Sequence, residues 1–152
     1  MRALLQRVRQ AVVTVDGRTV GQIGRGWLVL LGVGQGDTAA IADTLADKVV
    51  GLRCFEDELG KTNLAIKDVD GAVLLVSQFT LYADVSRGRR PGFTNAAAPE
   101  VAETLVNAFG TALRRHGLHV EDGEFGAHMQ VSLVNDGPFT IWLDSNQVAQ
   151  LM

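Results

Sequence analysis

The 152-residue sequence predicts a single compact α+β domain, residues 1–152, in which a strand-rich sheet packs against two main helices at about 38–53 and 99–116. Three observations support this fold class. Strand patterns dominate the first third and the end of the chain, and two segments repeat apolar residues at spacings of three and four. The length is sufficient for one core, and the 17 glycines suit tight turns between strands.

The first third of the chain has the pattern of a β-sheet. Residues 11–15 are rich in β-branched side chains, and Asp16-Gly17 separates them from a second strand pattern at 19–23, as in a hairpin. Residues 27–33 form a continuous apolar run. Such a run is typical of a strand that is buried on both faces.

The two helices follow from their apolar spacing and their end signals. Asp37 or Thr38 can cap the first helix, whose apolar positions are Ile41, Leu45, Val49 and Leu52. Pro99 fits the first turn of the second helix, and Gly117 fits its end. We expect one face of that helix to carry Val101, Leu105, Phe109, Ala112 and Leu113.

The second half of the chain returns to strands. Residues 72–76 have the pattern of a buried strand that runs on into residues 77–80, and residues 83–98 form a long loop. Near the end, the runs 129–134 and 141–143 flank Asn135-Asp136-Gly137-Pro138-Phe139-Thr140. Taken alone, this turn chemistry predicts an ordinary hairpin, although Gly-Pro also permits unusual backbone geometry that directs carbonyl oxygens outward.

Composition limits the classes of function. The net charge of −3 argues against a general electrostatic nucleic-acid binder, so any such contact needs a local basic patch. Cys54 is the only cysteine, which excludes an internal disulfide and a multi-cysteine zinc site and favours the reducing cytoplasm. The N-terminus lacks a signal-peptide core, and the longest apolar run is too short to span a bilayer. We expect a soluble cytoplasmic protein with no membrane association.

Ser77-Gln78-Phe79-Thr80 is the first candidate site. Polar side chains at the end of a buried strand are costly unless they are hydrogen-bonded or used. They either bind a polar substrate, with Phe79 as an apolar wall, or mark a strand that reaches the surface. Thr80 is a candidate nucleophile, but no histidine or lysine stands in a sequence relation that marks it as the base.

Three further groups have a structural and a functional interpretation. Arg87, Arg89 and Arg90 either contact phosphates or form a solvated basic loop. Phe125 is either a core aromatic or a stacking platform for a base. The pair His116 and His119 straddles a predicted helix end without a supporting cysteine or carboxylate cluster, so we expect structural histidines and no metal.

Taken together, several motifs resemble the D-aminoacyl-tRNA deacylase family. They are Met1-Arg2-Ala3, Gln6-Arg7-Val8, residues 29–33, Ser77-Gln78-Phe79-Thr80-Leu81-Tyr82, Arg87-Gly88-Arg89-Arg90-Pro91, Phe125-Gly126-Ala127 and Asn135-Asp136-Gly137-Pro138-Phe139-Thr140. The resemblance covers nearly the whole chain, with the two main motifs in the family's order. Gly92 departs from the pattern, because most relatives are expected to carry a serine after the proline.

The resemblance implies a homodimer of barrel-like domains with active sites at or near the interface, acting on the 3′-terminal adenosine end of aminoacyl-tRNA without a cofactor. It implies catalytic-pocket roles for Ser77, Gln78, Phe79 and Thr80. It also implies that a cis Gly137–Pro138 peptide enters the partner's pocket as a chirality filter. The substrate-binding and selectivity residues would be Asn135, Gly137, Pro138, Thr140, Phe125 and Met129, with Arg87, Arg89 and Arg90 as tRNA contacts.

The missing base is consistent with a substrate that supplies its own catalytic group. An aminoacyl ester on the terminal ribose has a neighbouring hydroxyl, while backbone N–H groups near Phe79 and Thr80 can donate to the developing oxyanion. We therefore expect Thr80 to position the substrate, with covalent nucleophile as the alternative. Glycine has no side chain to reject, so the filter implies activity on glycyl-tRNA. The competing functions are a non-catalytic nucleic-acid-binding module and a metal-dependent esterase.

Overall fold

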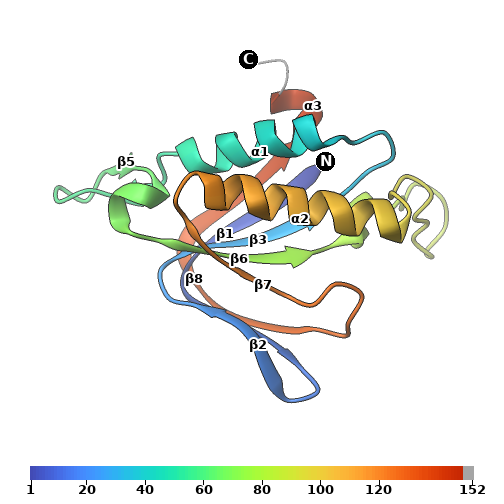
Figure 1. The fold of residues 1–152 in the computed structure, drawn as a ribbon, viewed down its shortest axis with the longest axis horizontal. Coiled ribbons are helices and arrows are strands. Elements are labelled where there is room, and N and C mark those ends of the chain that lie inside the picture. Colours follow the sequence, from blue (N-terminus) through green and yellow to red (C-terminus); the bar gives the residue numbers. More distant parts are fainter. Residues whose placement is uncertain (149–152) are drawn as a thin grey trace.

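The computed structural model describes residues 1–148 and has the α+β architecture predicted from the sequence (Figure 1). The last four residues of the predicted domain lie outside the described part. The main sheet has the order β2-β1-β3-β6-β7, with β8 also paired to β1. Its strands are β1 (Arg2–Val15), β2 (Arg18–Ile23), β3 (Gly26–Gly32), β6 (Ala72–Ser77), β7 (His119–Asp122) and β8 (Gln130–Asp144).

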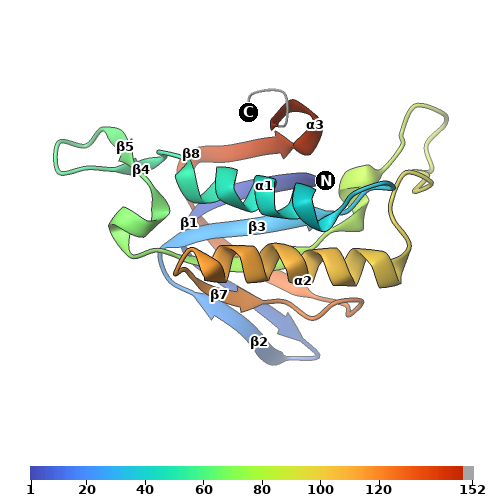
Figure 2. The same cartoon turned by 45° about the horizontal axis from the view of Figure 1, so that its top comes forward.

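Two helices cover one face of this sheet side by side, as Figure 2 shows. They are α1 (Ala39–Gly51) and α2 (Pro99–Arg115), each within two residues of its predicted bounds. The smaller elements are α3 (Ser145–Val148), the hairpin β4 (Phe55–Glu56) and β5 (Thr62–Leu64), and the 3₁₀ turns η1 (Ile66–Val69) and η2 (Phe79–Tyr82).

Strand β1 makes the sheet curl into a barrel-like shape because it pairs with three strands. Along one edge it is antiparallel to β8 over nearly its whole length. Along the other edge, residues 2–8 pair with β3 and residues 11–15 pair with β2. The sequence pattern predicted only residues 11–15 as strand, so the first half of β1 is an addition, as is β7, which lies parallel to β6.

Apolar side chains fill both faces of the central strands. Trp27 and Val29 of β3 face the helices, where they meet a core that includes Leu45 and Phe109. Leu28, between them in sequence, faces a second core with Val8 and Val76, covered by β2 and the first half of β8. This burial on both sides explains the continuous apolar run at 27–33.

The predicted apolar face of α2 is wrong at one position. Val101 is 48% exposed, whereas Ala102 and Val106 are buried with Leu105 and Phe109. Positions 101 and 102 are adjacent in the helix, so their side chains point in directions about 100° apart. The helix therefore turns its small residue at 102 toward the sheet, and this leaves room beside it.

Thr38 is the cap of α1, and its hydroxyl accepts a hydrogen bond from the N–H of Ile41 at 3.3 Å. Asp37, the other candidate, accepts a hydrogen bond from the N-terminal ammonium of Met1 at 2.8 Å instead. The ammonium is also bound by the hydroxyl of Ser145 at 2.7 Å, which ties the start of β1 to α3.

We predict that Thr38→Ala lowers the free energy of unfolding by about 1 kcal/mol, because one N–H of the first helical turn loses its acceptor. Thr38→Ser keeps the hydroxyl and should stay close to the wild type. Urea denaturation monitored by circular dichroism measures both variants. Equal losses in the two would show that the cap hydroxyl contributes nothing.

The segment 135–140 is not a hairpin turn. Residues 130–134 and 140–144 on either side of it both pair with β1 in one continuous strand, β8, whose register shifts between Val8 and Gln10 and between Gln6 and Val8. The residues between are therefore a bulge in β8. The local turn chemistry led to the wrong prediction, because pairing with a strand more than 120 residues earlier in the chain decides the structure.

Cys54 is buried, with 8% of its surface exposed, and it packs in the core on the helix side of the sheet. Burial raises the pKa of its thiol, an effect that the guanidinium of Arg7 partly opposes. We predict slow reaction with a disulfide reagent at pH 8 in the native protein and fast reaction after denaturation, because the thiolate is the reactive form. A native rate equal to the denatured rate would contradict this.

Within residues 1–148, no helix has the length and apolar character needed to cross a membrane.

Candidate functional site

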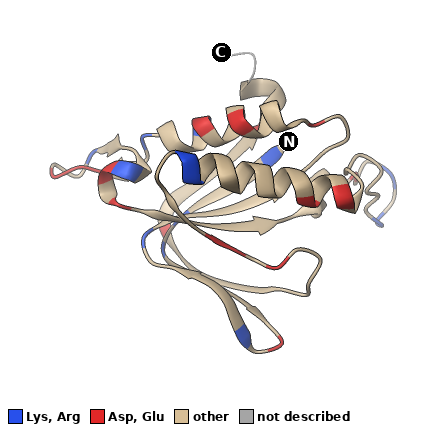
Figure 3. Cartoon of the chain, in the orientation of Figure 1, with Lys and Arg blue, Asp and Glu red and all other residues tan. Residues whose placement is uncertain are grey.

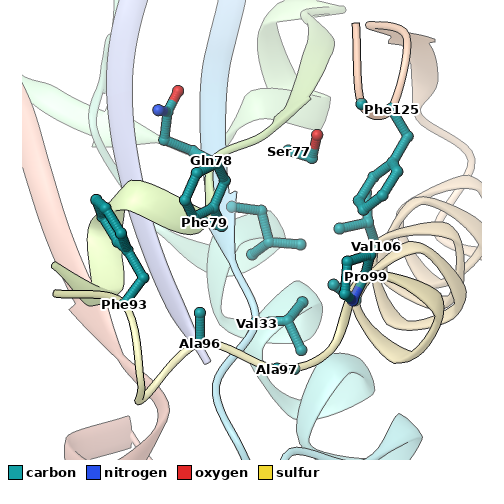
Figure 4. Close-up of a pocket in the computed structure, with 13 residues that line it drawn as sticks. Val33, Ser77, Gln78, Phe79, Phe93, Ala96, Ala97, Pro99, Val106 and Phe125 are labelled. Carbon is teal, nitrogen blue, oxygen red and sulfur yellow. The ribbon is translucent and has the colours of Figure 1, made fainter.

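A cavity of about 380 Å³ opens where β3 and β6 end beneath the first turns of α2 (Figure 4). Its walls come from the ends of the two strands, from η2, from the loop at 93–97, from α2 and from the loop at 125–126. Thirteen residues line it, and none of them carries an ionisable side chain: Leu31, Val33, Ser77, Gln78, Phe79, Phe93, Ala96, Ala97, Pro99, Ala102, Val106, Phe125 and Gly126. The cavity therefore suits an uncharged, largely aromatic or apolar ligand group.

The motif 77–80 forms one rim of this cavity. Strand β6 ends at Ser77, and the N–H of Gln78 still donates to the carbonyl of Leu31 at 2.8 Å. The chain then enters the turn η2, so Phe79 and Thr80 leave the strand that the sequence pattern extended through them. Ser77, Gln78 and Phe79 line the cavity, while Thr80 is exposed beside it and accepts a hydrogen bond from the amide of Gln78.

The turn η2 leaves two backbone donors at this rim. The first N–H groups of a helical turn have no partner within it. Among residues 1–148, the N–H groups of Phe79 and Thr80 have no hydrogen-bond acceptor, whereas those of Gln78, Leu81 and Ala83 are paired. Two adjacent free donors next to a water-accessible cavity are the arrangement that binds a developing oxyanion.

Three phenylalanines shape the cavity. Phe79 and Phe93 pack edge to face, with ring centroids 5.0 Å apart and an interplanar angle of 69°, and both remain exposed, by 56% and 38%. Phe125 reaches in from the opposite side and lies near Val106 of α2 in Figure 4. Aromatic faces on two sides of a cavity can hold a flat base by stacking.

The Gly137–Pro138 segment lies away from this cavity in the same chain. Ser77 is level with Ala3 of β1 through Leu31, whereas Asn135 pairs with Val8. Asn135 is therefore five residues, about 17 Å, from the level of Ser77 along the strand, and Thr140, which pairs with Gln6, is three residues, about 10 Å, from it. The Gly137–Pro138 peptide is cis, and Asn135, Gly137, Pro138 and Thr140 are all exposed. Met129 packs against the second core and does not line the cavity.

Arg7 holds this bulge in place from beneath. Its guanidinium is buried, with the residue 2% exposed, and donates to the carbonyl of Asp136 at 3.0 Å and to that of Cys54 at 2.5 Å. It also lies 3.3 Å from the carboxylate of Asp136 and 4.3 Å from the ring centre of Phe139. The side-chain amide of Asn135 closes the bulge by donating to the carbonyls of Arg7 and Phe139.

The other candidates lie on the surface. Arg87, Arg89 and Arg90 are exposed in the loop that leads to Phe93. His116 lies 3.6 Å from Asp47, and His119 lies 3.2 Å from Glu121, and neither histidine lines the cavity. Among the described residues, no three His, Cys, Asp or Glu side chains are grouped as a metal site would require.

The comparisons with known proteins agree with this arrangement of motifs. A family model described as D-Tyr-tRNA(Tyr) deacylase matches residues 4–144, which is nearly the whole chain. The chain belongs to the D-Tyr-tRNA(Tyr) deacylase family. The resemblance predicted from the two motifs is thereby confirmed at the level of the family.

Members of the deacylase family match over almost their whole length. A protein of Symbiobacterium thermophilum named D-aminoacyl-tRNA deacylase is 61% identical, covering 97% of each chain. One of the same name from Roseiflexus castenholzii is 60% identical, covering 95% of this chain and 92% of that one.

Two solved structures share the fold. One titled c-Myc DNA Unwinding Element Binding Protein has a TM-score of 0.89 and 44% identity, covering 95% of this chain and 98% of that chain. One titled as a probable eukaryotic D-amino acid tRNA deacylase has a TM-score of 0.80 and 19% identity, covering 93% and 97%. At that identity the second match shows the fold alone.

Proposed function

We propose that the chain hydrolyses the ester bond of D-aminoacyl-tRNA in the cytoplasm, releasing the amino acid and the tRNA. Relatives about 60% identical over nearly their full length carry this name. The observation that carries the proposal is the pair of free N–H groups at Phe79 and Thr80, on the rim of a cavity without ionisable side chains. This arrangement fits a reaction that needs an oxyanion site but no base from the protein.

The cavity takes the terminal adenosine. Phe125 and Val106 form one apolar wall, and Phe79 with Phe93 forms the other. An adenine held between these walls brings its ribose to the rim, where the ester carbonyl meets the two N–H groups. Ser77 and Gln78 are the polar side chains in the lining, and they are in place to hydrogen-bond the nucleoside.

In this reaction water attacks the ester carbonyl, and negative charge develops on its oxygen, which the N–H groups of Phe79 and Thr80 stabilise. The bond between the carbonyl carbon and the ribose oxygen then breaks. The neighbouring ribose hydroxyl relays the proton from the attacking water to the leaving oxygen. Thr80 acts as a positioning residue, because the amide of Gln78 already donates to its hydroxyl and no histidine, lysine or carboxylate of residues 1–148 is hydrogen-bonded to it.

Selectivity for D-amino acids comes from the Gly137–Pro138 segment of a second copy of the chain. The segment is exposed and lies about 10–17 Å along β1 from the level of the cavity in its own chain. It therefore reaches a cavity only in a homodimer. Val134 and Trp142 on the same strand are 44% and 46% exposed, which provides apolar area for such an interface. A rigid main chain that excludes L side chains has nothing to exclude in glycine, so glycyl-tRNA is also a substrate.

The test of this function is deacylation of D-tyrosyl-tRNA, L-tyrosyl-tRNA and glycyl-tRNA by purified protein. We expect fast release of D-tyrosine and glycine and slow release of L-tyrosine. Release of D-tyrosine no faster than in buffer would disprove the activity. Equal rates for the D and L esters would disprove the selectivity while leaving the hydrolysis.

We predict that Thr80→Ala lowers kcat by at most about 100-fold, because the variant keeps both N–H donors and loses only the positioning hydroxyl. Ser77→Ala is the matched control for the loss of one hydroxyl in the same motif. A covalent nucleophile would instead be essential, so a complete loss of activity in Thr80→Ala, with no acyl-enzyme left to trap, would support the nucleophile mechanism.

A non-catalytic nucleic-acid-binding module is the second candidate. It is favoured by the solved structure at 44% identity, whose title names a DNA unwinding element binding protein. The net charge of −3 and the absence of cationic side chains from the cavity lining argue against it. Salt-sensitive affinity for uncharged DNA or RNA, together with no turnover of any aminoacyl ester, would establish this function instead.

A further inference from the structure

We propose that the loop at residues 84–92, here called the Arg hairpin, binds the phosphodiester backbone of the RNA strand that leads into the cavity. The carboxylates beyond Phe125, on the opposite side of the cavity, repel the phosphates of the strand and so keep it from leaving on that side. The charge on the two sides of the cavity thus sets the path of the strand. This inference rests on the proposed function, which supplies the RNA.

The Arg hairpin is a defined structure, closed at its base. Asp84 and Gly92 exchange two backbone hydrogen bonds of 2.7 and 2.9 Å. The side chain of Ser86 and its backbone N–H, the latter at 2.9 Å, both donate to the carboxylate of Asp84 and hold the pKa of that carboxyl below its usual value. Gly88 makes the turn at φ +66°. The base adjoins the cavity directly, because Phe93 follows Gly92 and lines it.

Its three arginines carry charge that the described part of the chain does not neutralise. Within residues 1–148, no carboxylate lies within ion-pair distance of Arg87, Arg89 or Arg90. Six other arginines do have such partners: Arg2, Arg7, Arg9, Arg18, Arg114 and Arg115. Three exposed guanidinium groups within four residues are well suited to phosphate oxygens, which they bind in bidentate fashion.

The opposite side of the cavity carries the reverse charge. A second cleft of about 250 Å³ shares Ser77, Val106 and Phe125 with the cavity and is lined by Glu103, Asp122 and Glu124. Arg114 pairs with Asp122 at 2.6 Å and Arg18 approaches Glu124 at 3.9 Å, so the carboxylates exceed the cations there. In Figure 3 the basic residues lie at the outer end of the Arg hairpin, beyond the first turn of α2, and the acidic residues lie on α2 itself. A phosphate chain leaving the cavity is attracted to one side and repelled from the other.

The experiment compares R87Q/R89Q/R90Q with a control that removes the same charge elsewhere. The control is K48Q/K61Q/K67Q, which changes the three lysines of the chain. They lie near β4, β5 and η1, at the end of the molecule opposite the Arg hairpin in Figures 1 and 2. The two variants have the same net charge, so a difference between them reports position.

The first measurement is the affinity for uncharged tRNA as a function of salt. Each phosphate neutralised on a single strand contributes about 0.7 to the slope of log K against log salt, so three contacts contribute about 2. Between 50 and 200 mM salt, the wild type should therefore lose about 20-fold more affinity than the Arg variant. The Lys control should keep the wild-type slope. Equal slopes in all three proteins, or the same change in both variants, would overturn the proposal.

The second measurement separates strand binding from an effect on the cavity wall. It compares kcat/KM for D-tyrosyl-tRNA with kcat/KM for the D-tyrosyl ester of adenosine, which has no phosphate. The kcat/KM for the tRNA substrate divided by that for the adenosine ester should fall in the Arg variant and stay at the wild-type value in the Lys control. A fall by the same factor for both substrates would mean that the hairpin acts through Phe93, and would overturn the proposal. Wild-type protein that hydrolyses neither ester would refute the proposed function. The salt slopes would still show whether the Arg hairpin binds the phosphates of RNA.

Discussion

Replacing Arg7 by alanine should lower the free energy of unfolding by about 3–5 kcal/mol, the usual cost of removing one partner of a buried charged network. The guanidinium is the donor to two carbonyls, those of Cys54 and Asp136, and it lies over the ring of Phe139. Its loss removes the donor to the buried carbonyl of Cys54 and to the partly buried carbonyl of Asp136, and opens a void in the sheet. Thermal denaturation should show a fall of about 10 °C in Tm.

Arg9 supplies a matched control two residues away on the same strand. It is also an arginine near Asp136, at 4.0 Å, but its side chain is 77% exposed. Solvent screens such a pair, so Arg9→Ala should change the free energy of unfolding by less than about 0.5 kcal/mol. Similar losses in the two variants would show that burial of Arg7 contributes little.

Arg7→Lys tests whether the geometry of the group matters in addition to its charge. Lysine keeps the positive charge but lacks the planar fork that serves several acceptors at once. If the Gly137–Pro138 segment selects against L-amino acids as proposed, loosening its support should raise the rate on L-tyrosyl-tRNA relative to D-tyrosyl-tRNA. An unchanged ratio of the L to the D rate in a folded Arg7→Lys protein would show that the contacts of Arg7 with the bulge do not affect the selectivity.

Local patterns predicted the regular elements well because local physics decides them. The buried strand at 27–33 and the helix that Thr38 caps needed only apolar periodicity and an end signal. The first half of β1 was missed although the buried residues Ala3 and Leu5 alternate with half-buried neighbours, because Arg7 occupies the next inward position. A charge at a core-facing position breaks the alternation, and it is itself the signal of a buried anchor.

The cavity was harder to predict than the motif beside it. Ser77 and Gln78, with Phe79 beside them, stood out because polar side chains at the end of a buried strand are costly unless they are hydrogen-bonded or bind a ligand. Ala96, Ala97 and Ala102 contribute by being small, which gives no signal in one sequence, and Phe93 and Val106 look like ordinary apolar residues. The bulge at 135–140 depends on pairing with β1, which turn chemistry alone does not contain.

The backbone donors at Phe79 and Thr80 can be tested by removing one N–H without deleting a residue. Phe79 is the first residue of the turn η2, the position at which proline is best tolerated because its N–H has no partner in the turn. Gln78 before it has φ −146° and ψ 77°, so it lies outside the helical region that a following proline disfavours. Phe79→Pro should therefore fold.

Phe79→Ala is the control, because it loses the same ring and keeps the N–H. We expect kcat of Phe79→Pro to be about 10²–10³ lower than that of Phe79→Ala, the typical effect of deleting one oxyanion donor. Single-turnover rates on D-tyrosyl-tRNA at saturating enzyme measure this difference apart from binding. Equal rates in two variants of equal Tm would remove the N–H of Phe79 from the mechanism. The oxyanion would then depend on Thr80 and on the ribose of the substrate.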